Sequence, residues 1–333
     1  MLGQTSMPAW SLAVSHDGTQ MAYTSEAAGV AAPTSIQLWR LGSNGFVPLQ
    51  WTLATTQSSK SLRSFHAYPV QCEFSSDDQT LTVAYIRAFQ TPAQFVVAAW
   101  NTKTGKQLWH FDGLKNFAPA RLFLSPQGRQ LAVCEWEKEK LTLFDLSRPR
   151  PIPHSKDALA RDFSIQAVFP IVGDSVAWTP DGQTLTVYTG PHIEFWNIKN
   201  KTHILPDTSG LPSSGGSRQM RWSPDGRLLA TSDTVNLAIW NKATRTWTSI
   251  SYTGDSPYGT FSLAWMPDSQ SLWVGGEGAS VGAGHVQQMS AFDLKMLREY
   301  PISGPVALSS DGRTLATRNM DKGSNSVWLW NTG

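Results

Sequence analysis

A unit that recurs seven times along the chain limits the possible folds more than any other property of the sequence. In each copy a short apolar run leads into a turn of the Ser-Pro-Asp-Gly type, and a second apolar run follows. After a variable loop comes a third apolar run, which ends in Trp or Phe. The clearest copy is Met-Arg-Trp-Ser-Pro-Asp-Gly at 220–226, followed by Leu-Ala-Ile-Trp-Asn at 237–241. Equivalent turn positions, 43 to 60 residues apart, are Asp17, Asp77, Gln127, Asp181, Asp225, Asp268 and Asp311.

The residue types that recur in each turn are explained by the conformation of a hairpin turn. Pro presets φ at the second turn position, Asp bonds to its own backbone, and Gly accepts positive φ. The flanking runs, such as 263–265 and 315–317, are short and apolar, as in strands buried on both faces. A fourth strand is expected at 107–111, after a polar turn. Four short antiparallel strands per unit predict an all-β chain, a single seven-bladed β-propeller domain over residues 1–333.

The aromatic residues that end the third runs suit the space between neighbouring blades, where one ring buries about 150–250 Å². The chain has 15 Trp, and blade packing accounts for many of them. We therefore expect them to establish the fold and not to form a ligand cage. The Trp residues assigned to packing in this way are Trp39, Trp100, Trp196, Trp240 and Trp330. Phe144 and Phe292 take the same place in the third and sixth units.

These units resemble the WD40 repeat family, in particular the divergent bacterial propellers whose blades carry a Ser-Pro-Asp-Gly turn. The resemblance extends over nearly the whole chain and implies a β-propeller that binds another macromolecule. The Trp-Asp pair of the family is Trp-Asn in four copies, Phe-Asp in two and Trp-Arg in the first. The family's Gly-His pair before the first strand is absent from every unit, since Gly284-His285 lies in a loop before a third strand. Asp233 could be the Asp of the family's buried His–Asp network, but its His is missing, so packing is expected to supply most of the blade rigidity.

The resemblance also concerns the last unit, which stops at Gly333 just after its third strand. Members of the family complete the last blade with an N-terminal strand, and residues 2–7 are the segment available for it. We expect residues 2–7 to supply that strand. The alternative is a truncated chain whose last blade has three strands and an open edge.

Composition gives the chain no electrostatic signature for nucleic acid or membrane. The 27 basic and 25 acidic residues nearly cancel, and no run of 18 apolar residues occurs. The N-terminus lacks the basic start and apolar core of a secretory signal. We therefore expect a soluble, cytoplasmic monomer, with an exported or larger signalling parent protein as the open alternative. Cys72 and Cys134 sit in apolar runs and are expected to be small buried side chains.

No sequence motif predicts a metal, a cofactor or catalysis. The seven His residues form no i, i+4 pair, and the glycine-rich segment 275–284 lacks the Lys-Ser/Thr of a phosphate loop. Asn200-Lys201-Thr202 fits a glycosylation acceptor but lies in an expected hairpin turn. A propeller enzyme or small-ligand binder that uses the central funnel remains the alternative, and an apolar inner ring argues against a metal there. The residues that begin the first strands, and so form that expected ring, are Leu12, Cys72, Leu122, Val176, Met220, Leu263 and Val306.

Two sets of loops are expected on one face, those before each first strand and those between second and third strands. Loops held by a rigid scaffold carry binding residues, and aromatic or Arg side chains are the usual anchors. We therefore predict a non-catalytic scaffold or sensor module that binds a protein or peptide through these loops, although each residue alone could equally be a partly packed loop residue. The candidates before first strands are Trp10, His66, Tyr68, Arg121, Arg218, Tyr258 and Phe261. Those in or near the other loops are Arg87, Phe89, Trp136, His192 and Arg318.

Overall fold

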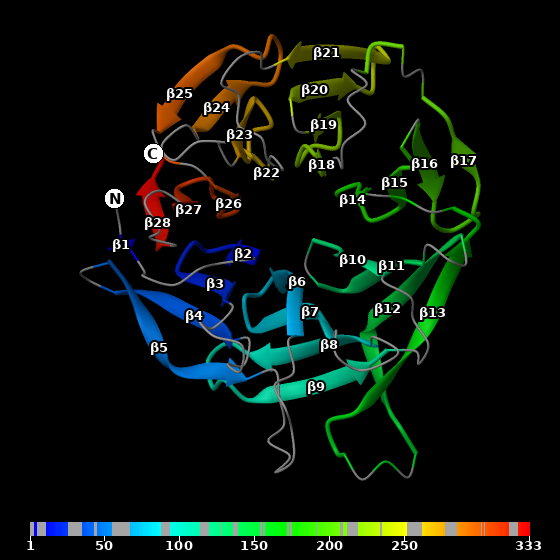
Figure 1. Ribbon diagram of the computed structural model, residues 1–333, viewed down its shortest axis with the longest axis vertical. Helices are drawn as coiled ribbons and strands as arrows, with labels where there is room; N and C mark the ends of the chain where they lie inside the picture. Colours follow the sequence, from blue (N-terminus) through cyan, green and yellow to red (C-terminus); the bar gives the residue numbers. More distant parts are fainter. Residues whose placement is uncertain are drawn as a thin grey trace. The chain divides into compact units, whose positions relative to one another are not determined.

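The computed structural model contains residues 1–333, and the part of it that can be described consists of strands and the turns that join them (Figure 1). Among the described residues, no helix has the length and apolar character that crossing a membrane requires. The described residues are 3–4, 11–25, 35–42, 45–54, 67–87, 94–113, 120–126, 128–135, 139–153, 155, 157–171, 173, 175–190, 192–206, 209–211, 219–233, 235–251, 262–276, 285–300, 302, 304–319 and 326–333.

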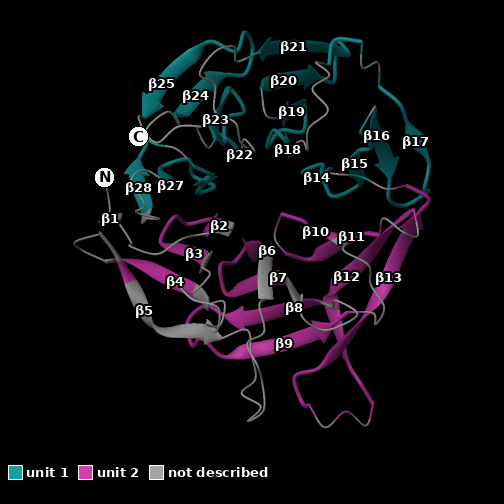
Figure 2. Cartoon of the chain, in the orientation of Figure 1, with its two compact units in different colours: residues 1–7, 173–333 teal, residues 8–172 magenta. Residues whose placement is uncertain are grey.

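The described strands form seven four-stranded antiparallel sheets, which match the seven predicted blades. We number the blades 1 to 7 in chain order of their first strands. The chain divides into two compact units, Pro8–Val172 and Met1–Met7 with Gly173–Gly333, which we describe separately (Figure 2). The expectation that they make a single domain stays a prediction.

The unit Pro8–Val172 contains three blades, each with its strands in sequence order. Blade 1 consists of β2 (Ser11–Val14), β3 (Gln20–Ser25), β4 (Ser35–Gly42) and β5 (Gly45–Ala54). Blade 2 consists of β6 (Ala67–Phe74), β7 (Thr80–Arg87), β8 (Gln94–Asn101) and β9 (Gln107–Asp112). Blade 3 consists of β10 (Ala120–Leu124), β11 (Gln130–Glu135), β12 (Lys140–Pro151) and β13 (Arg161–Phe169).

The other unit contains four blades. Blade 4 consists of β14 (Ser175–Trp178), β15 (Thr184–Tyr188), β16 (Ile193–Asn197) and β17 (His203–Ile204). Blade 5 consists of β18 (Gln219–Trp222), β19 (Leu228–Ser232), β20 (Asn236–Asn241) and β21 (Thr246–Ser251). Blade 6 consists of β22 (Ser262–Trp265), β23 (Ser271–Gly275), β24 (Val286–Ser290) and β25 (Met296–Tyr300). Blade 7 consists of β26 (Val306–Leu308), β27 (Thr314–Asn319), β28 (Ser326–Asn331) and β1 (Gly3–Gln4).

The fourth strand of blade 7 comes from the N-terminal segment, as predicted. Gly3 pairs with Leu329 and Gln4 with Trp328, so β1 adds antiparallel to the outer edge of β28. The remainder of the predicted segment 2–7 lies outside the described residues. This pairing satisfies backbone groups that would otherwise form an open sheet edge.

Five of the described turns between first and second strands share one side-chain hydrogen-bond pattern. In blade 5, Ser223 Oγ donates to Asp225 Oδ1 at 2.6 Å and accepts from Leu228 N at 2.9 Å. Asp225 Oδ1 also accepts from Arg227 N at 3.1 Å, and Gly226 has φ +69°. The predicted roles of Asp and Gly are therefore confirmed, and the hydroxyl of the first residue is a further reason for the recurrence. The same hydroxyl contacts occur at Ser15, Ser75, Thr179 and Ser309.

The aromatic residue of the third strand lies in a fixed register, and one predicted member of this set is wrong. Trp240 pairs with Leu229 in blade 5 and is buried, and the residue of blade 6 in that register is Met289, which pairs with Leu272. Phe292 instead lies in the turn after β24 and is 64% exposed. Of the packing residues named from sequence, Trp100, Phe144, Trp196 and Trp240 are buried, and Trp39 and Trp330 are half-buried.

Whether the first-strand residues named from sequence form an apolar inner ring stays a prediction. Cys72, Leu122 and Met220 are buried between sheets, so they do not face solvent, and the alternate residues of the same strands are more open. These include Glu73 in β6, which is half-buried, and Arg121 in β10, which is exposed. Because successive side chains of a strand point to opposite faces, Glu73 and Arg121 lie on the other face of their strands from Cys72 and Leu122. The other ring residues Val176, Leu263 and Val306 are buried, and Leu12 is half-buried.

Candidate functional site

Two of the predicted loop residues have described side chains, and both are exposed. Arg121 is the second residue of β10, where it lies opposite Cys134 of β11. His192 precedes β16, and its backbone carbonyl accepts a hydrogen bond from Thr189 N at 3.0 Å. Arg121 belongs to one compact unit and His192 to the other.

Three further candidates lie in strands. This corrects the position of Tyr68, which was expected before a first strand, whereas Arg87 and Arg318 lie at the ends of second strands, near the loops to which they were assigned. Tyr68 lies in β6 and Arg87 in β7, because this pair of strands continues for three residue pairs past the bulge between Pro69 and Gln71. Tyr68 is opposite Ile86, and Arg87 is opposite Ala67, so Tyr68 and Arg87 come to the same end of the sheet. Arg318 lies in β27. The candidates outside the described residues are Trp10, His66, Phe89, Trp136, Arg218, Tyr258 and Phe261.

Buried carboxylates lie at the end of the second strand in two blades. Glu135 ends β11, and Lys140 Nζ lies 3.0 Å from its Oε2 across the start of β12. Asp233 follows β19 at the equivalent position of blade 5 and is fully buried. A buried charge is tolerated only when it is paired and hydrogen-bonded, so both carboxylates organise the connection to the third strand.

Blade 5 contains a buried polar network around Asp233 that uses Asn and Ser in place of the missing His. Asp233 accepts hydrogen bonds from the backbone N and the side-chain Nδ2 of Asn236, at 2.8 and 3.1 Å. Asn236 Oδ1 in turn accepts from Ser251 Oγ at 2.7 Å, which ties β20 to β21. Sequence reasoning missed Asn236 and Ser251 because it looked for His, although the spacing Asp-x-x-Asn across a short loop was a usable signal.

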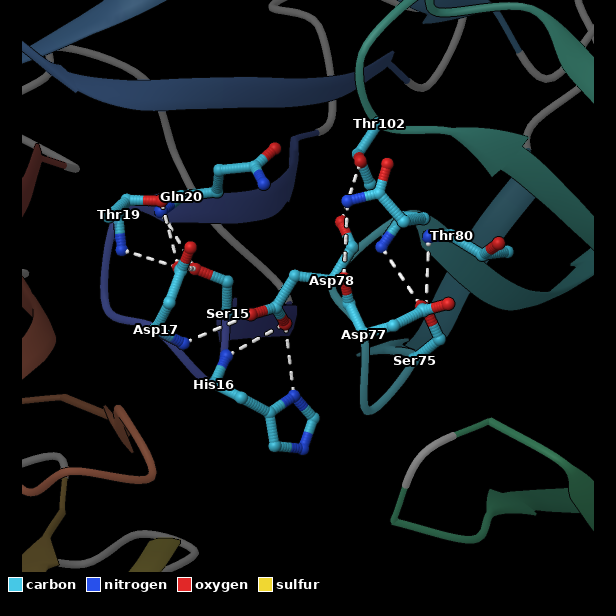
Figure 3. Close-up of polar contacts among 11 residues, drawn as sticks. Ser15, His16, Asp17, Thr19, Gln20, Ser75, Asp77, Asp78, Thr80 and Thr102 are labelled. Atoms are coloured by element: carbon cyan, nitrogen blue, oxygen red, sulfur yellow. Dashed lines mark hydrogen bonds and ion pairs between the residues drawn. The ribbon is translucent and has the colours of Figure 1, made fainter.

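The turns of neighbouring blades are joined in the unit Pro8–Val172 through Asp78 (Figure 3). Asp78 occupies the turn position that is Gly in five other blades, and its φ is +55°. Its carboxylate accepts from His16 N at 2.8 Å and from Asp17 N at 3.0 Å, and His16 Nδ1 lies 3.0 Å from Oδ1. Ser269 of blade 6 takes the same turn position, and its Oγ accepts from Asp225 N of blade 5 at 3.2 Å. In both pairs of blades, the turns between first and second strands are therefore bonded to each other and belong to the scaffold.

The turn carboxylates are held in the ionised form. The hydroxyl of Ser75 and the backbone N–H of Gln79 lower the pKa of Asp77 below its ordinary value. The hydroxyl of Thr179, followed by the N–H of Gln183, does the same for the pKa of Asp181. Donors that stabilise the charged form favour ionisation. These carboxylates are therefore structural acceptors and poor candidates for acid–base chemistry near neutral pH.

Blade 6 exposes three large apolar side chains on one hairpin. Phe292 is 64% exposed in the turn, and Met296 and Leu297 at the start of β25 are 53% and 59% exposed. The hydroxyl of Ser290 and the side chain of Lys295 lower the pKa of Asp293, in the same turn, to about 2. An apolar surface beside fixed charges is typical of a protein contact.

No group of three or more His, Cys, Asp or Glu side chains in the described ranges is arranged to hold a metal ion. Cys72 and Cys134 are buried, as expected of small core residues.

Comparison with known proteins identifies the fold. No family model matches the chain, and no curated protein matches it. The β-propeller domain of Cps50 (Swd1) from Myceliophteria thermophila is 11% identical, with a TM-score of 0.66 over 99% of this chain and 98% of that one. Hydrazine synthase from Kuenenia stuttgartiensis is 16% identical, with a TM-score of 0.66 over 100% of this chain and 98% of that one. At such identities the likeness concerns the fold alone, and together with the seven sheets it shows that the chain is a seven-bladed β-propeller.

Proposed function

We propose that the protein is a non-catalytic scaffold that binds another protein through exposed, variable residues of its blades. The observation that carries the proposal is the apolar hairpin of blade 6, formed by Phe292, Met296 and Leu297. In the equivalent turn position blade 2 has Lys103 and blade 4 has Lys199, as expected of a solvated turn. An aromatic residue that is 64% exposed there has no role in the blade core and is the kind of anchor that interfaces use.

The recurring residues of the chain support the same conclusion. The Ser, Asp and Gly of each turn are bonded within the blades, and the strand residues are packed between them. Because these groups already bond and pack within the blades, a partner would contact the residues that differ from blade to blade. The loop group predicted from sequence, of which Arg121 and His192 are exposed, belongs to this variable set.

A second candidate function is the binding of a small ligand beside the first strands. Glu73 and Arg121 lie in the alternate positions of β6 and β10 that face outward from the sheets. Gln71 connects the two strands, since its Oε1 accepts from Leu124 N at 2.8 Å and its Nε2 donates to Glu73 Oε1 at 2.8 Å. Tight binding of a metabolite or metal by the isolated protein, with no protein partner captured, would favour this candidate.

Affinity capture followed by mass spectrometry tests the proposal. The native chain is compared with a loop variant (Ala at Trp10, Tyr68, Arg121 and Arg218) and a hairpin variant (Phe292→Ser with Leu297→Ser). We expect a defined partner with the native chain and its loss with at least one variant. A partner retained equally by both folded variants, or no partner at all, would refute the proposal.

A further inference from the structure

We propose that the turns at one end of blades 4 and 5 form a docking site for an acidic, partly apolar peptide segment of a partner protein. We call this site the basic turn patch. It consists of five exposed cations, Lys199, Lys201, Arg227, Lys242 and Arg245. The inference rests on the proposed function in taking the partner to be a protein. It concerns the opposite end of the strands from the predicted loop group.

The turns that carry these cations are contiguous. Ile198 N donates to Gln183 O in blade 4, and Lys242 N donates to Arg227 O in blade 5, both at 2.9 Å. Each bond ties the third-to-fourth-strand turn of a blade to its first-to-second-strand turn. Between the blades, a Cβ added at Gly226 would lie 3.6 Å from Pro180 Cδ, which is ordinary contact. Four turns therefore make one surface.

The charge of this surface is not balanced. Its two carboxylates, Asp181 and Asp225, are each engaged by the hydroxyl and N–H donors of their own turns. Two of the five cations would suffice to balance them, and the one exposed ion pair, Arg227 Nε to Asp225 Oδ2 at 3.8 Å, is long. The equivalent turns of blades 6 and 7 have the opposite excess, with the cations Lys295 and Arg313 against the carboxylates Asp268, Asp293 and Asp311. Within the unit that contains blades 4 to 7, the positive charge is thus local to blades 4 and 5.

Two of the cations occupy positions where the backbone favours glycine. Lys201 and Arg245 have φ of +58° and +59°, and blade 2 has Gly105 with φ +67° at the same turn position. Leu294 of blade 6 also has positive φ there, but its side chain is buried in the core. Neither Lys201 nor Arg245 makes a side-chain hydrogen bond or ion pair within the described part of the chain. Strain of this kind is retained where the side chain serves a purpose, and here the charge is what the side chain supplies.

The neighbouring residues favour a peptide over a polyanion. Ile204 and Leu205 follow Lys201 at the outer edge of blade 4 and are 69% and 58% exposed. A segment that alternates acidic and apolar residues would complement both the cations and these side chains. A nucleic acid would bring closely spaced phosphates against Asp181 and Asp225 as well as against the cations. The patch therefore matches a peptide whose carboxylates are separated by apolar residues.

Fluorescence anisotropy with a labelled peptide of alternating Glu and Leu tests the inference. The patch variant has Lys199→Gln, Lys201→Gly, Lys242→Gln and Arg245→Gly. The matched control loses the same number of exposed cations, by Gln at Lys103, Lys106, Lys295 and Arg313. We expect the native chain and the control to bind the peptide, and the patch variant to bind it at least about tenfold more weakly. Binding should also weaken as salt is raised.

Three results of the peptide assay would overturn the inference. These are equal peptide binding by the patch variant and the control, equal binding of a Lys–Leu peptide, and tighter binding of an oligothymidylate than of the acidic peptide. Circular dichroism of each variant verifies the fold, and the glycine substitutions relieve strain, so misfolding does not explain a loss. A captured partner whose binding survives in the patch variant would overturn this inference and leave the proposed function intact.

Discussion

Asp78 of blade 2 binds His16 of blade 1 through two contacts, one to the backbone N at 2.8 Å and one to ring Nδ1 at 3.0 Å. The carboxylate also accepts from Asp17 N at 3.0 Å. A turn residue in a left-handed conformation thus holds two blades together. Ser269 and Asp225 repeat the arrangement with a single bond.

Asp78→Ala is expected to destabilise the protein by about 2–4 kcal/mol, because three donors lose a charged acceptor while the strained φ remains. Asp78→Gly loses the same bonds but relieves the strain, so it should cost about 1 kcal/mol less. Urea unfolding followed by Trp fluorescence measures both. Equal stability of Asp78→Ala and the native chain would show that the contact contributes nothing.

The left-handed turn residues give a second prediction. Lys201→Gly and Arg245→Gly should each raise the free energy of unfolding by up to about 1 kcal/mol, since both side chains are exposed. Leu294→Gly should instead lower it by about 1–3 kcal/mol, because the relief of strain is smaller than the loss of a buried Leu. Thermal unfolding distinguishes the two directions. A stabilising Leu294→Gly would mean that its side chain does not pack as described.

The sequence predicted these turns well and the exposed surfaces poorly, for a local reason. The hydrogen bonds of a turn join residues a few positions apart. The local pattern that contains Ser223, Asp225 and Gly226 therefore predicts the turn directly. In blade 6 the register depends on Met289 and Ser290, which lack the aromatic-Asn marker, and Phe292 gave a false marker three residues after Met289. The result was an exposed aromatic residue assigned to the core.

The sequence patterns also could not predict contacts between segments that are far apart in the chain. The Asn236 to Ser251 bond joins two strands, and the His16 to Asp78 contact joins two blades. No spacing in the sequence signals either contact, because each depends on strand register and on the fit of neighbouring sheets. The candidate loop residues stay predictions, since loops differ from blade to blade and share no common sequence pattern.

The hydroxyl of the turn predicts a pH effect. Thr179→Val removes the first donor to Asp181, so the pKa of Asp181 should rise toward its ordinary value. When the pKa of a carboxyl group is lower in the folded than in the unfolded chain, its ionised form stabilises the fold at pH values above the ordinary pKa. This stabilisation is lost as the pH falls through the folded pKa. The variant should therefore lose less stability than the native chain as the pH falls through and below the ordinary pKa of 3.8. Carboxyl NMR titration checks the pKa, and an unchanged value would contradict the assigned bond.

The buried network of blade 5 gives a further prediction. Asn236→Ala removes the side-chain donor to Asp233 and the acceptor of Ser251, and is expected to cost about 2–4 kcal/mol. Ser251→Ala removes only the outer bond and should cost about 1 kcal/mol. Urea unfolding compares them. Equal effects would show that Asp233 does not depend on Asn236.

The central claim is that the recurring residues build the scaffold and that the variable exposed residues bind the partner. The most direct measurement is the Kd of a captured partner for three folded proteins, the native chain, Ser309→Ala and Phe292→Ser, each below its unfolding temperature. Ser309→Ala removes the turn hydroxyl of blade 7, which lies outside the basic turn patch. We predict an unchanged Kd for Ser309→Ala, although it is less stable, and a Kd raised at least about tenfold for Phe292→Ser, although its stability is unchanged. Weaker binding by Ser309→Ala with native binding by Phe292→Ser would contradict the account.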